Sequence, residues 1–426
     1  GQKPDDQPHH RKGRRIRCQR VRPAVKGPGQ RRKTAEERQG TQEAGDRLDH
    51  GASFRRAGVR MQAVCFARRD CLSPASQIVP LRKSRFMSAT GLPFDDIRAL
   101  VRQMPQQDGR ARHDARHRQE ELTKPSGSLG RLEDIAEWMA AWQGRAPTVN
   151  RPVVAVFAAN HGIAARGASA FPPEVTRQMV ENFAAGGAAI NQICATFDLG
   201  LKIFDLALDY PTGDITLEPA LSERDCAATM AYGMECLAGE PDLLCIGEMG
   251  IGNTAVASAL FAALFGGTAR DWVGPGTGHD SAGMARKTAL VQEAIDLHGR
   301  HAADPLEALR RLGGREIAAM GGAILAARMQ RVPVIVDGFV ATAAAAVLYK
   351  LAPDTIDHCL FGHVSAEPGH QRALQAMGKV PLLALGMRLG EGTGAALAAA
   401  MVKAAVACHN GMATFAQAGV SDRAAD

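Results

Sequence analysis

Short apolar segments alternate with longer amphipathic segments from residue 151 onward. The apolar segments predict strands at 153–158, 201–206, 242–246, 332–336, 355–361 and 381–385. The segments between them repeat apolar residues with a helical period and predict helices at 173–184, 220–238, 253–264, 282–297, 314–329 and 338–351. Strands that alternate with helices predict a doubly wound α/β fold, in which helices cover both faces of a mostly parallel sheet.

Helical periodicity also marks the residues on either side of this α/β region. Amphipathic segments at 93–104, 110–123 and 129–142 predict three further helices. We therefore expect four parts: an extension at 1–86, a helical part at 87–150, an α/β domain at 151–395 and a helical part at 396–426. Because ligands of parallel sheets bind beyond the carboxyl ends of the strands, candidate site residues should directly follow the strands.

The extension, residues 1–86, differs in composition from the rest of the chain. It contains 22 Lys and Arg against 8 Asp and Glu, whereas residues 87–426 contain 29 and 36. It has no sustained apolar period, so it cannot bury enough surface to offset the entropy of ordering, and we expect disorder. One alternative is a nucleic-acid-binding arm, although aromatic residues are not interleaved with its charge runs. Another is upstream sequence translated ahead of Met87, since the chain begins with Gly1.

Cysteine usage and apolar runs bear on the compartment. The nine cysteines form no C-x-x-C pair, and Cys245 and Cys359 lie within apolar segments. This pattern argues against a zinc ribbon or disulfide framework and favours reduced thiols in a cytoplasmic protein. The longest uncharged stretch, 249–269, contains several glycines and predicts a buried helix rather than a membrane span. We therefore expect neither a membrane partner nor a secretion signal.

A first glycine-rich turn follows the strand predicted at 242–246. It reads Gly250-Ile251-Gly252-Asn253-Thr254 and precedes a predicted helix. Glycines there let backbone N–H groups approach an anion at the helix N-terminus. The same turn partly matches a dinucleotide-binding pattern, with Asp271 as its acid. An NAD-dependent dehydrogenase is therefore an alternative function.

Two further glycine clusters carry charged residues. Gly274-Pro275-Gly276-Thr277-Gly278 precedes a helix with Lys287, and a glycine turn with a nearby lysine suits a phosphate group. Gly390-Glu391-Gly392 follows the strand predicted at 381–385. A carboxylate at this place would repel a phosphate, so Glu391 is a candidate general base. The alternative is a glutamate that only stabilises the helix dipole.

Residues 363–370 contain two histidines and a glutamate, which raises the question of a metal site. Their spacing matches no zinc motif, and Pro368 interrupts a helix through them. We therefore expect a loop near the ligand and no metal.

Seven stretches, in this order, resemble the nicotinate-nucleotide:dimethylbenzimidazole phosphoribosyltransferase family. They are 124–133 (KPSGSLGRLE), 159–162 (ANHG), 172–176 (PPEVT), 247–254 (GEMGIGNT), 336–339 (VDGF), 363–367 (HVSAE) and 387–395 (MRLGEGTGA). The resemblance implies a Rossmann-like doubly wound α/β domain, a small helical domain built from both chain ends, and a homodimer.

The resemblance also implies a reaction. The phosphoribosyl group of nicotinate mononucleotide is transferred to 5,6-dimethylbenzimidazole with inversion at the anomeric carbon, which gives α-ribazole 5′-phosphate and nicotinate. No metal or organic cofactor is implied. The expected partners are these small molecules and a second copy of the chain, and nucleic acid is not expected.

Residue roles follow from the same resemblance. It implies Glu391 as the general base and Glu248 as a second catalytic residue. The residues implied to contact the ribose and the phosphate are Gly250, Gly252, Asn253, Thr254, Gly276, Lys287, Ser365, Arg388 and Gly390. Phe171, Pro172 and Met179 are implied to hold the benzimidazole. Asn160 stands where many members have Asp, and Phe171 and Met179 stand where polar residues occur, so the preferred base, dimethylbenzimidazole or adenine, stays open.

Overall fold

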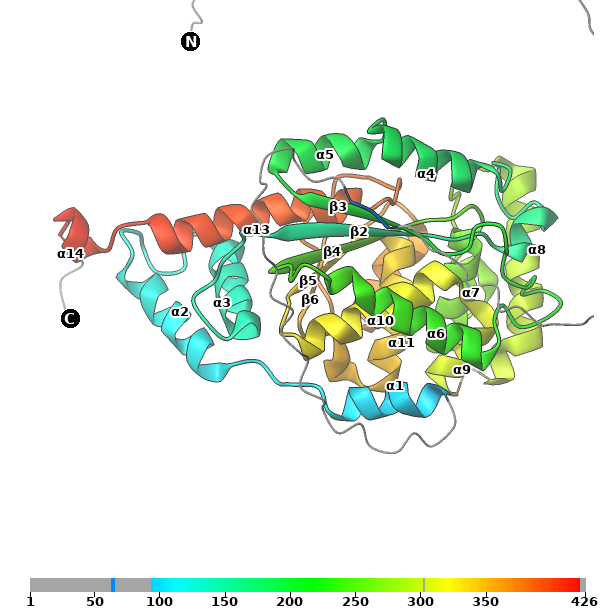
Figure 1. The fold of residues 1–426 in the computed structure, drawn as a ribbon, viewed down its shortest axis with the longest axis horizontal. Helices are drawn as coiled ribbons and strands as arrows, with labels where there is room; N and C mark the ends of the chain where they lie inside the picture. Colours follow the sequence, from blue (N-terminus) through cyan, green and yellow to red (C-terminus); the bar gives the residue numbers. More distant parts are fainter. Residues whose placement is uncertain (1–62, 66–92, 302, 422–426) are drawn as a thin grey trace, which may run out of the picture. The chain divides into compact units, whose positions relative to one another are not determined.

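A computed structural model describes residues 63–65, 93–301 and 303–421. It contains a six-stranded sheet with the order β1-β3-β2-β4-β5-β6 (Figure 1). The strands are β1 Ala63–Cys65, β2 Pro152–Ala158, β3 Gly200–Asp205, β4 Leu243–Met249, β5 Val334–Val336 and β6 Cys359–Phe361. β2 to β6 are parallel, and β1 pairs antiparallel with β3. The predicted mostly parallel sheet is confirmed.

The order of the parallel strands defines where a ligand can bind. Numbered along the chain, β2 to β6 have the order 2-1-3-4-5, which is a doubly wound order. The direction of winding reverses between β2 and β4. At such a switch point the loops after neighbouring strands diverge and leave a crevice at the carboxyl ends of the strands.

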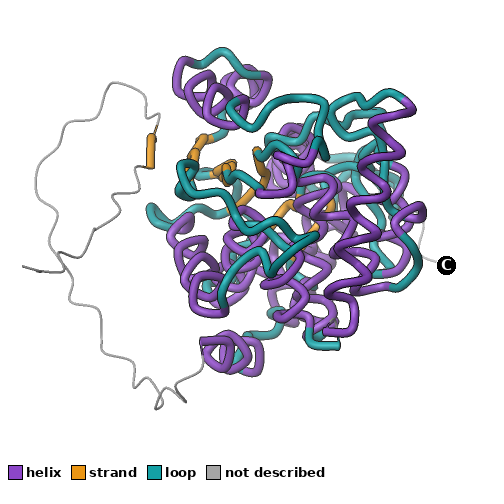
Figure 2. Tube along the Cα trace, turned by 90° about the vertical axis from the view of Figure 1, so that its right-hand side faces the viewer, coloured by secondary structure: helices purple, strands orange, loops and turns teal. Residues whose placement is uncertain are grey.

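Helices connect the strands and cover both faces of the sheet. They are α1 Pro93–Arg102, α2 Gly109–Glu121, α3 Arg131–Gln143, α4 Val175–Ala185, α5 Ala189–Phe197, α6 Glu223–Gly233, α7 Asn253–Phe265, α8 Ser281–His298, α9 Pro305–Leu312, α10 Arg315–Met329, α11 Phe339–Leu351, α12 Pro368–Ala376, α13 Thr393–Gly411 and α14 Phe415–Ala418. Figure 2 shows the parallel strands between helices, with the short edge strand β1 outside them.

The strands are apolar along their whole length because both of their faces are buried. Successive residues of β2 alternate between two hydrophobic cores. Ala155 and Phe157 belong to one core, with residues of α6, α7, α10 and α11. Val154 and Val156 belong to the other core, with residues of α4, α5 and α13. The period of two along the strand therefore supplies apolar side chains to both layers of helices.

The helices near both chain ends lie together beside the sheet. α2 and α3 pack against the C-terminal half of α13 (Figure 1). Arg118 of α2 donates a hydrogen bond to the carbonyl oxygen of His409 at 2.7 Å, and Leu122 pairs with Thr414 in an isolated β-bridge. α1 differs, since Phe94 and Ile97 are buried in the core that contains α6. The expected boundary between 395 and 396 falls inside the continuous helix α13.

Several expectations about elements are wrong. Residues 381–385 form only an isolated bridge, between Leu383 and His363, because their hydrogen bonds to the end of β6 do not extend into a ladder. Helices α5, α9 and α12 were not expected, whereas most of α13 lies in the helical part expected at 396–426. Pro368 does not interrupt a helix but begins α12, where its missing N–H costs nothing.

The extension at 1–86 is described only at 63–65. These residues form β1 rather than the expected disordered chain, and the rest of the extension lies outside the described residues. No helix in the described part of the chain has both the length and the apolar character needed to cross a membrane.

A chain that begins at Met87 should fold, because the residues of the two hydrophobic cores all lie from Phe94 onward. The only described strand that is lost is β1, which pairs through three residues with the edge of β3. We expect a melting temperature within about 5 °C of that of the full chain, the range for a change near 1 kcal/mol. Thermal unfolding of both chains, followed by circular dichroism, tests this. An insoluble product or a much larger drop would show that the extension is part of the fold.

Candidate active site

A cavity of about 360 Å³ lies at the carboxyl ends of β4, β5 and β6. Eleven of the fourteen residues proposed from the sequence line it: Phe171, Met179, Glu248, Gly250, Asn253, Thr254, Gly276, Ser365, Arg388, Gly390 and Glu391. Pro172, Gly252 and Lys287 do not. Residues that are far apart in the sequence are thus brought together at the carboxyl ends of the parallel strands.

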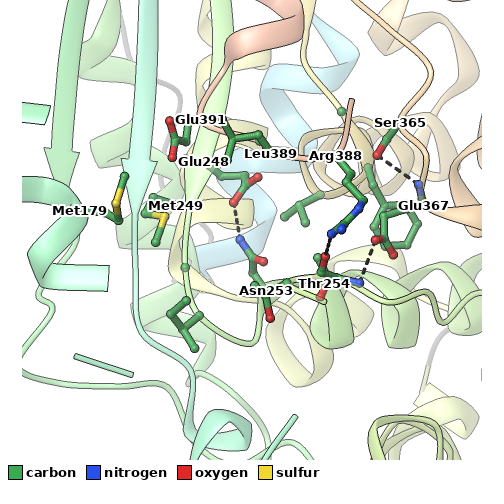
Figure 3. Close-up of a pocket in the computed structure, with 18 of the residues that line it drawn as sticks. Met179, Glu248, Met249, Asn253, Thr254, Ser365, Glu367, Arg388, Leu389 and Glu391 are labelled. Atoms are coloured by element: carbon green, nitrogen blue, oxygen red, sulfur yellow. Dashed lines mark hydrogen bonds between the residues drawn. The ribbon is translucent and has the colours of Figure 1, made fainter. Parts of the chain in front are cut away.

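The cavity has two chemically different sides (Figure 3). Met179 and Met249 lie on one side, together with the carboxyl groups of Glu248 and Glu391. Arg388, Ser365 and Glu367 lie on the other side. The further apolar lining residues are Phe171, Val175, Ile251, Phe339, Val340 and Leu389. The arrangement suits a ligand with one apolar part and one polar part.

Glu391 has a backbone conformation that is rare for a residue with a side chain. Its φ is +62°, and the neighbouring Gly390 and Gly392 have φ values of +81° and +78°. Such a conformation costs about 1–3 kcal/mol and persists only where the surroundings hold it. The N–H of Glu391 donates to the backbone oxygen of Glu248 at 3.1 Å, and Thr393 Oγ1 donates to the backbone oxygen of Gly390 at 2.7 Å. Strain held in this way is typical of functional sites.

Burial sets the protonation of Glu391. Its side chain is only 4% exposed, and its Oε2 has no hydrogen-bond partner in the described structure. Burial, and secondly the charge of Asp337, raises the pKa of Glu391 to about 7. A carboxylate with this pKa is a better proton acceptor near neutral pH than an exposed one.

Glu248 lies beside Glu391 but in a different environment. Asn253, at the start of α7, donates a hydrogen bond to Glu248 Oε2. Burial first, then the charges of Asp337 and Glu316, raises the pKa of Glu248 well above its usual value. These surroundings favour the neutral form of Glu248, which leaves Glu391 as the carboxyl group better placed to accept a proton. Two carboxyl groups whose environments separate their pKa values are a common arrangement for divided roles.

On the polar side, three charged side chains hold the turn around Gly276. Glu367 Oε1 accepts a hydrogen bond from the N–H of Gly276 at 2.8 Å, and Arg388 donates to its carbonyl oxygen. Lys287 donates to the carbonyl oxygen of Gly274 at 2.9 Å. The N–H of Gly276 is thus already occupied, so it does not point freely into the cavity as the resemblance implied.

Lys287 lies behind this turn rather than in the cavity wall. It is fully buried, and its Nζ also donates to Thr254 Oγ1 at 2.8 Å. Burial lowers the pKa of Lys287 to about 8, and the charge of Glu367 partly opposes this effect. A Cβ at Gly276 would lie 2.8 Å from Nζ. Glycine at this position therefore leaves the positive charge unshielded by any side chain of the turn.

The three residues expected to hold a benzimidazole have separate positions. Phe171 is half exposed at the edge of the cavity, and Met179 lines it from α4. Pro172 lies outside the lining, where its carbonyl oxygen accepts from the N–H of Val175 and closes the turn before α4. Thr277 Oγ1 accepts from the N–H of Ala170 at 3.3 Å and so ties this segment to the glycine turn.

Three polar residues of the site were not among the site residues named from the sequence, although His363 and Glu367 lie in the loop that was expected near the ligand. Asp337 directly follows β5, His363 follows β6, and Glu367 is the residue before α12; His363 and Glu367 line the cavity. All three are nearly fully buried. A sequence signal was available for each of them, because all three lie within the stretches that carry the family resemblance, and Asp337 and His363 also closely follow strands.

The structure does not support Asp271 as the acidic residue of a dinucleotide-binding site. Asp271 ends a short 3-10 helix, Ala269–Asp271, rather than a strand, and it binds Thr268 and Arg372 away from the cavity. Among the described residues, no group of three or more His, Cys, Asp and Glu side chains is arranged to hold a metal ion.

An α/β fold with a buried carboxyl group of raised pKa, an apolar side and a cationic turn at the carboxyl ends of its parallel strands is typical of a group-transfer enzyme. Comparisons agree with this class. A family model described as phosphoribosyltransferase matches residues 104–420. The chain is 70% identical over 337 residues to the nicotinate-nucleotide–dimethylbenzimidazole phosphoribosyltransferase of Rhizobium leguminosarum bv. trifolii (strain WSM2304), covering 79% of this chain and 100% of that protein.

Further relatives give the same result. The corresponding protein of Rhizobium meliloti (strain 1021) is 69% identical over 337 residues, with the same coverage. A crystal structure of nicotinate-nucleotide-dimethylbenzimidazole phosphoribosyltransferase from Thermus thermophilus has a TM-score of 0.69 and 40% identity, covering 74% of this chain and all of that chain. The chain therefore belongs to the nicotinate-nucleotide–dimethylbenzimidazole phosphoribosyltransferase family.

Replacing Glu391 by Gln should stabilise the protein at pH 8 but much less at pH 5. The folded-state pKa of about 7 lies above the value near 4.5 of an unfolded chain, so ionisation of the buried group costs stability as the pH rises between these values. The gain at pH 8 has an upper bound on the order of 3 kcal/mol. Urea unfolding of both proteins at the two pH values measures it. An equal effect at both would contradict the raised pKa.

Proposed function

We infer that this chain transfers the phosphoribosyl group of nicotinate mononucleotide to 5,6-dimethylbenzimidazole and releases nicotinate and α-ribazole 5′-phosphate. The main support for this reaction is membership of the family. Within the structure, the observation that supports it most directly is the division of the cavity, with two carboxyl groups at its apolar side and the buried cation of Lys287 behind its polar side.

The polar side suits the ribose phosphate. The N-terminus of α7, preceded by Gly250 and Gly252, offers backbone N–H groups and the positive end of a helix dipole. Lys287 adds a positive charge behind Gly276, and the Ser365 hydroxyl lines the same side. Arg388 is held there by the Gly276 carbonyl oxygen. Together these groups would fix the sugar through its phosphate, with Asn253 and Thr254 beside it.

The apolar side suits the attacking base. A flat aromatic ring between Met179 and Leu389, with Phe171 at the entrance, would bury its faces and bring one ring nitrogen toward the anomeric carbon. No charged side chain of the described lining reaches this side except Glu248 and Glu391. The apolar lining favours dimethylbenzimidazole over adenine, whose more polar ring would be desolvated against mostly apolar side chains there.

The chemical step then requires one proton acceptor. A benzimidazole nitrogen forms a bond to the anomeric carbon as the bond to the nicotinate nitrogen breaks, and the electron pair of that bond returns to the pyridine ring. Nicotinate leaves as a neutral ring nitrogen, so no general acid is needed. Glu391 takes the proton from the second nitrogen of the benzimidazole. Attack from the face opposite the leaving group gives inversion, and alignment of the two rings supplies further rate.

Three wider features stay proposals. The helices α2, α3 and the end of α13 would form the small domain implied by the family, and the chain would form a homodimer. Six cysteines in the described residues are free, and five of them are buried, which supports a reducing, cytoplasmic location.

Glu391→Gln should fold and bind both substrates but turn over about 10²–10⁴-fold more slowly, because the amide keeps the shape and loses the basicity. Nicotinate release, followed by chromatography, gives the rate, and calorimetry gives the binding of each substrate. A folded glutamine variant that binds both substrates and reacts near the wild-type rate would remove Glu391 from the base role and make Glu248 the next candidate.

Lys287→Ala should lower kcat/KM for nicotinate mononucleotide by about 10- to 100-fold, the worth of a charge-assisted contact. The loss for the dephosphorylated riboside should be much smaller. Lys287→Met, which keeps most of the apolar stem, controls for packing. Since the pKa of Lys287 is about 8, the wild-type value for the mononucleotide should also decline above pH 8. Equal proportional losses for both substrates would argue against a phosphate role.

A further inference from the structure

One buried carboxylate in the site contacts the loop of Glu391 rather than the cavity. Asp337 follows β5 and is 1% exposed. Its Oδ1 accepts a hydrogen bond from the N–H of Ala395 at 2.8 Å, and its Oδ2 accepts from the N–H of Gly392 at 3.2 Å. Both donors lie at the start of α13, close to Glu391 in the sequence. Asp337 therefore occupies the N-terminus of α13, where the helix dipole favours a negative charge.

The backbone around these bonds leaves little room for adjustment. A Cβ at Gly247 would lie 2.2 Å from the nitrogen of Gly392, so the loop rests directly on β4. The N–H of Asp337 donates to the carbonyl oxygen of Ile246 at 3.2 Å, which ties the aspartate to the same strand. The strained conformation of Glu391 is thus held between β4 on one side and the Asp337 carboxylate on the other.

We propose that Asp337 is a positioning residue for the base: its carboxylate holds the strained turn of Glu391 in place and puts a fixed negative charge beside it, which strengthens Glu391 as a proton acceptor. This inference rests on the proposed role of Glu391. Asp337 itself does not touch the substrate, because it lies outside the cavity lining.

The charges around Glu391 agree with this role. The ionisable groups on the elements packed against it are Glu248 of β4, Asp337 after β5 and His363 after β6. Arg388, on the same loop, is directed to the carbonyl oxygen of Gly276 instead. After burial, Asp337 is the main cause that raises the pKa of Glu391. A carboxylate that holds a loop by hydrogen bonds would be replaceable by a neutral acceptor, whereas one that also supplies charge would not.

His363 completes the arrangement. Its Nε2 lies 3.8 Å from Asp337 Oδ1, and its ring is almost fully buried. Burial raises the pKa of Asp337, while His363 and the backbone N–H groups act in the opposite direction. The net shift of the Asp337 pKa is upward, and His363 and these N–H groups are the contacts that favour the ionised aspartate, which is the form that the proposal needs.

Two neutral substitutions test the proposal. Asp337→Asn and Asp337→Ser each keep one acceptor oxygen for the start of α13 and remove the charge. The measurement is the pH dependence of kcat/KM for 5,6-dimethylbenzimidazole between pH 5 and 9, at saturating nicotinate mononucleotide. We expect the acidic limb to move down by about one pH unit, as for loss of a neighbouring like charge. The rate at pH 8 should fall by up to about tenfold, because one loop hydrogen bond is lost.

Thr393→Val is the matched control, because it removes the hydrogen bond from Thr393 Oγ1 to Gly390 without changing any charge. It should lower the rate without moving the limb. An unshifted limb in folded Asp337 variants, or an equal shift in Thr393→Val, would overturn the proposal. Failure of both Asp337 variants to fold would also overturn it, since the role would then be structural.

Glu391→Gln separates this inference from the proposed function. In the pH profile of kcat/KM for Glu391→Gln, the only remaining acidic limb should be the one caused by protonation of the benzimidazole itself. If its acidic limb matches that of the wild type, the assignment of Glu391 as the base fails, whatever the Asp337 variants do. If the limb of Glu391→Gln moves and that of the Asp337 variants does not, the base assignment stands and only the role of Asp337 fails.

Discussion

The hydrogen bonds from the N–H groups of Gly392 and Ala395 to the buried Asp337 carboxylate join the start of α13 to the end of β5. Much of the structure depends on this joint. It places α13 on the face of the sheet that it shares with α4 and α5, and the far half of α13 then reaches α2 and α3. It also holds the left-handed turn that presents Glu391 to the cavity. One charge at a helix N-terminus thus joins two elements of the fold and lies beside the proposed base.

The site gathers charges that are costly to bury. Three carboxyl groups, on Glu248, Asp337 and Glu391, lie close together, and burial raises the pKa of each. On the other side, Lys287 is buried with its pKa lowered. Each shift means that folding opposes the charged form of that group. The hydrophobic cores on both faces of the sheet offset this cost, and the site contains a carboxyl group with a pKa of about 7 and a lysine with a pKa of about 8.

The sequence predicted most of the framework and much of the site. Alternation of apolar and amphipathic segments was enough for five parallel strands, and the resemblance named eleven residues that line the cavity. The predictions were wrong where a local sequence pattern indicated an element or a role that the contacts between distant residues do not support. Residues 381–385 are apolar like a strand, yet they make only one bridge. Asp271 has the right spacing for a dinucleotide site, yet it does not end a strand. Lys287 was identified, but its position behind Gly276 was not.

The sequence by itself determined the order of strands and helices, the glycine turns and the family, because periodicity and short motifs are local properties of the chain. Only the tertiary structure decided which ionisable side chains lie close enough to change each other's pKa. Asp337, His363 and Glu391 follow or precede different elements, and they meet because parallel strands present their carboxyl ends at one edge of the sheet. The pKa of Glu391 depends on burial and on the charge of Asp337, and both depend on distances that no linear pattern contains.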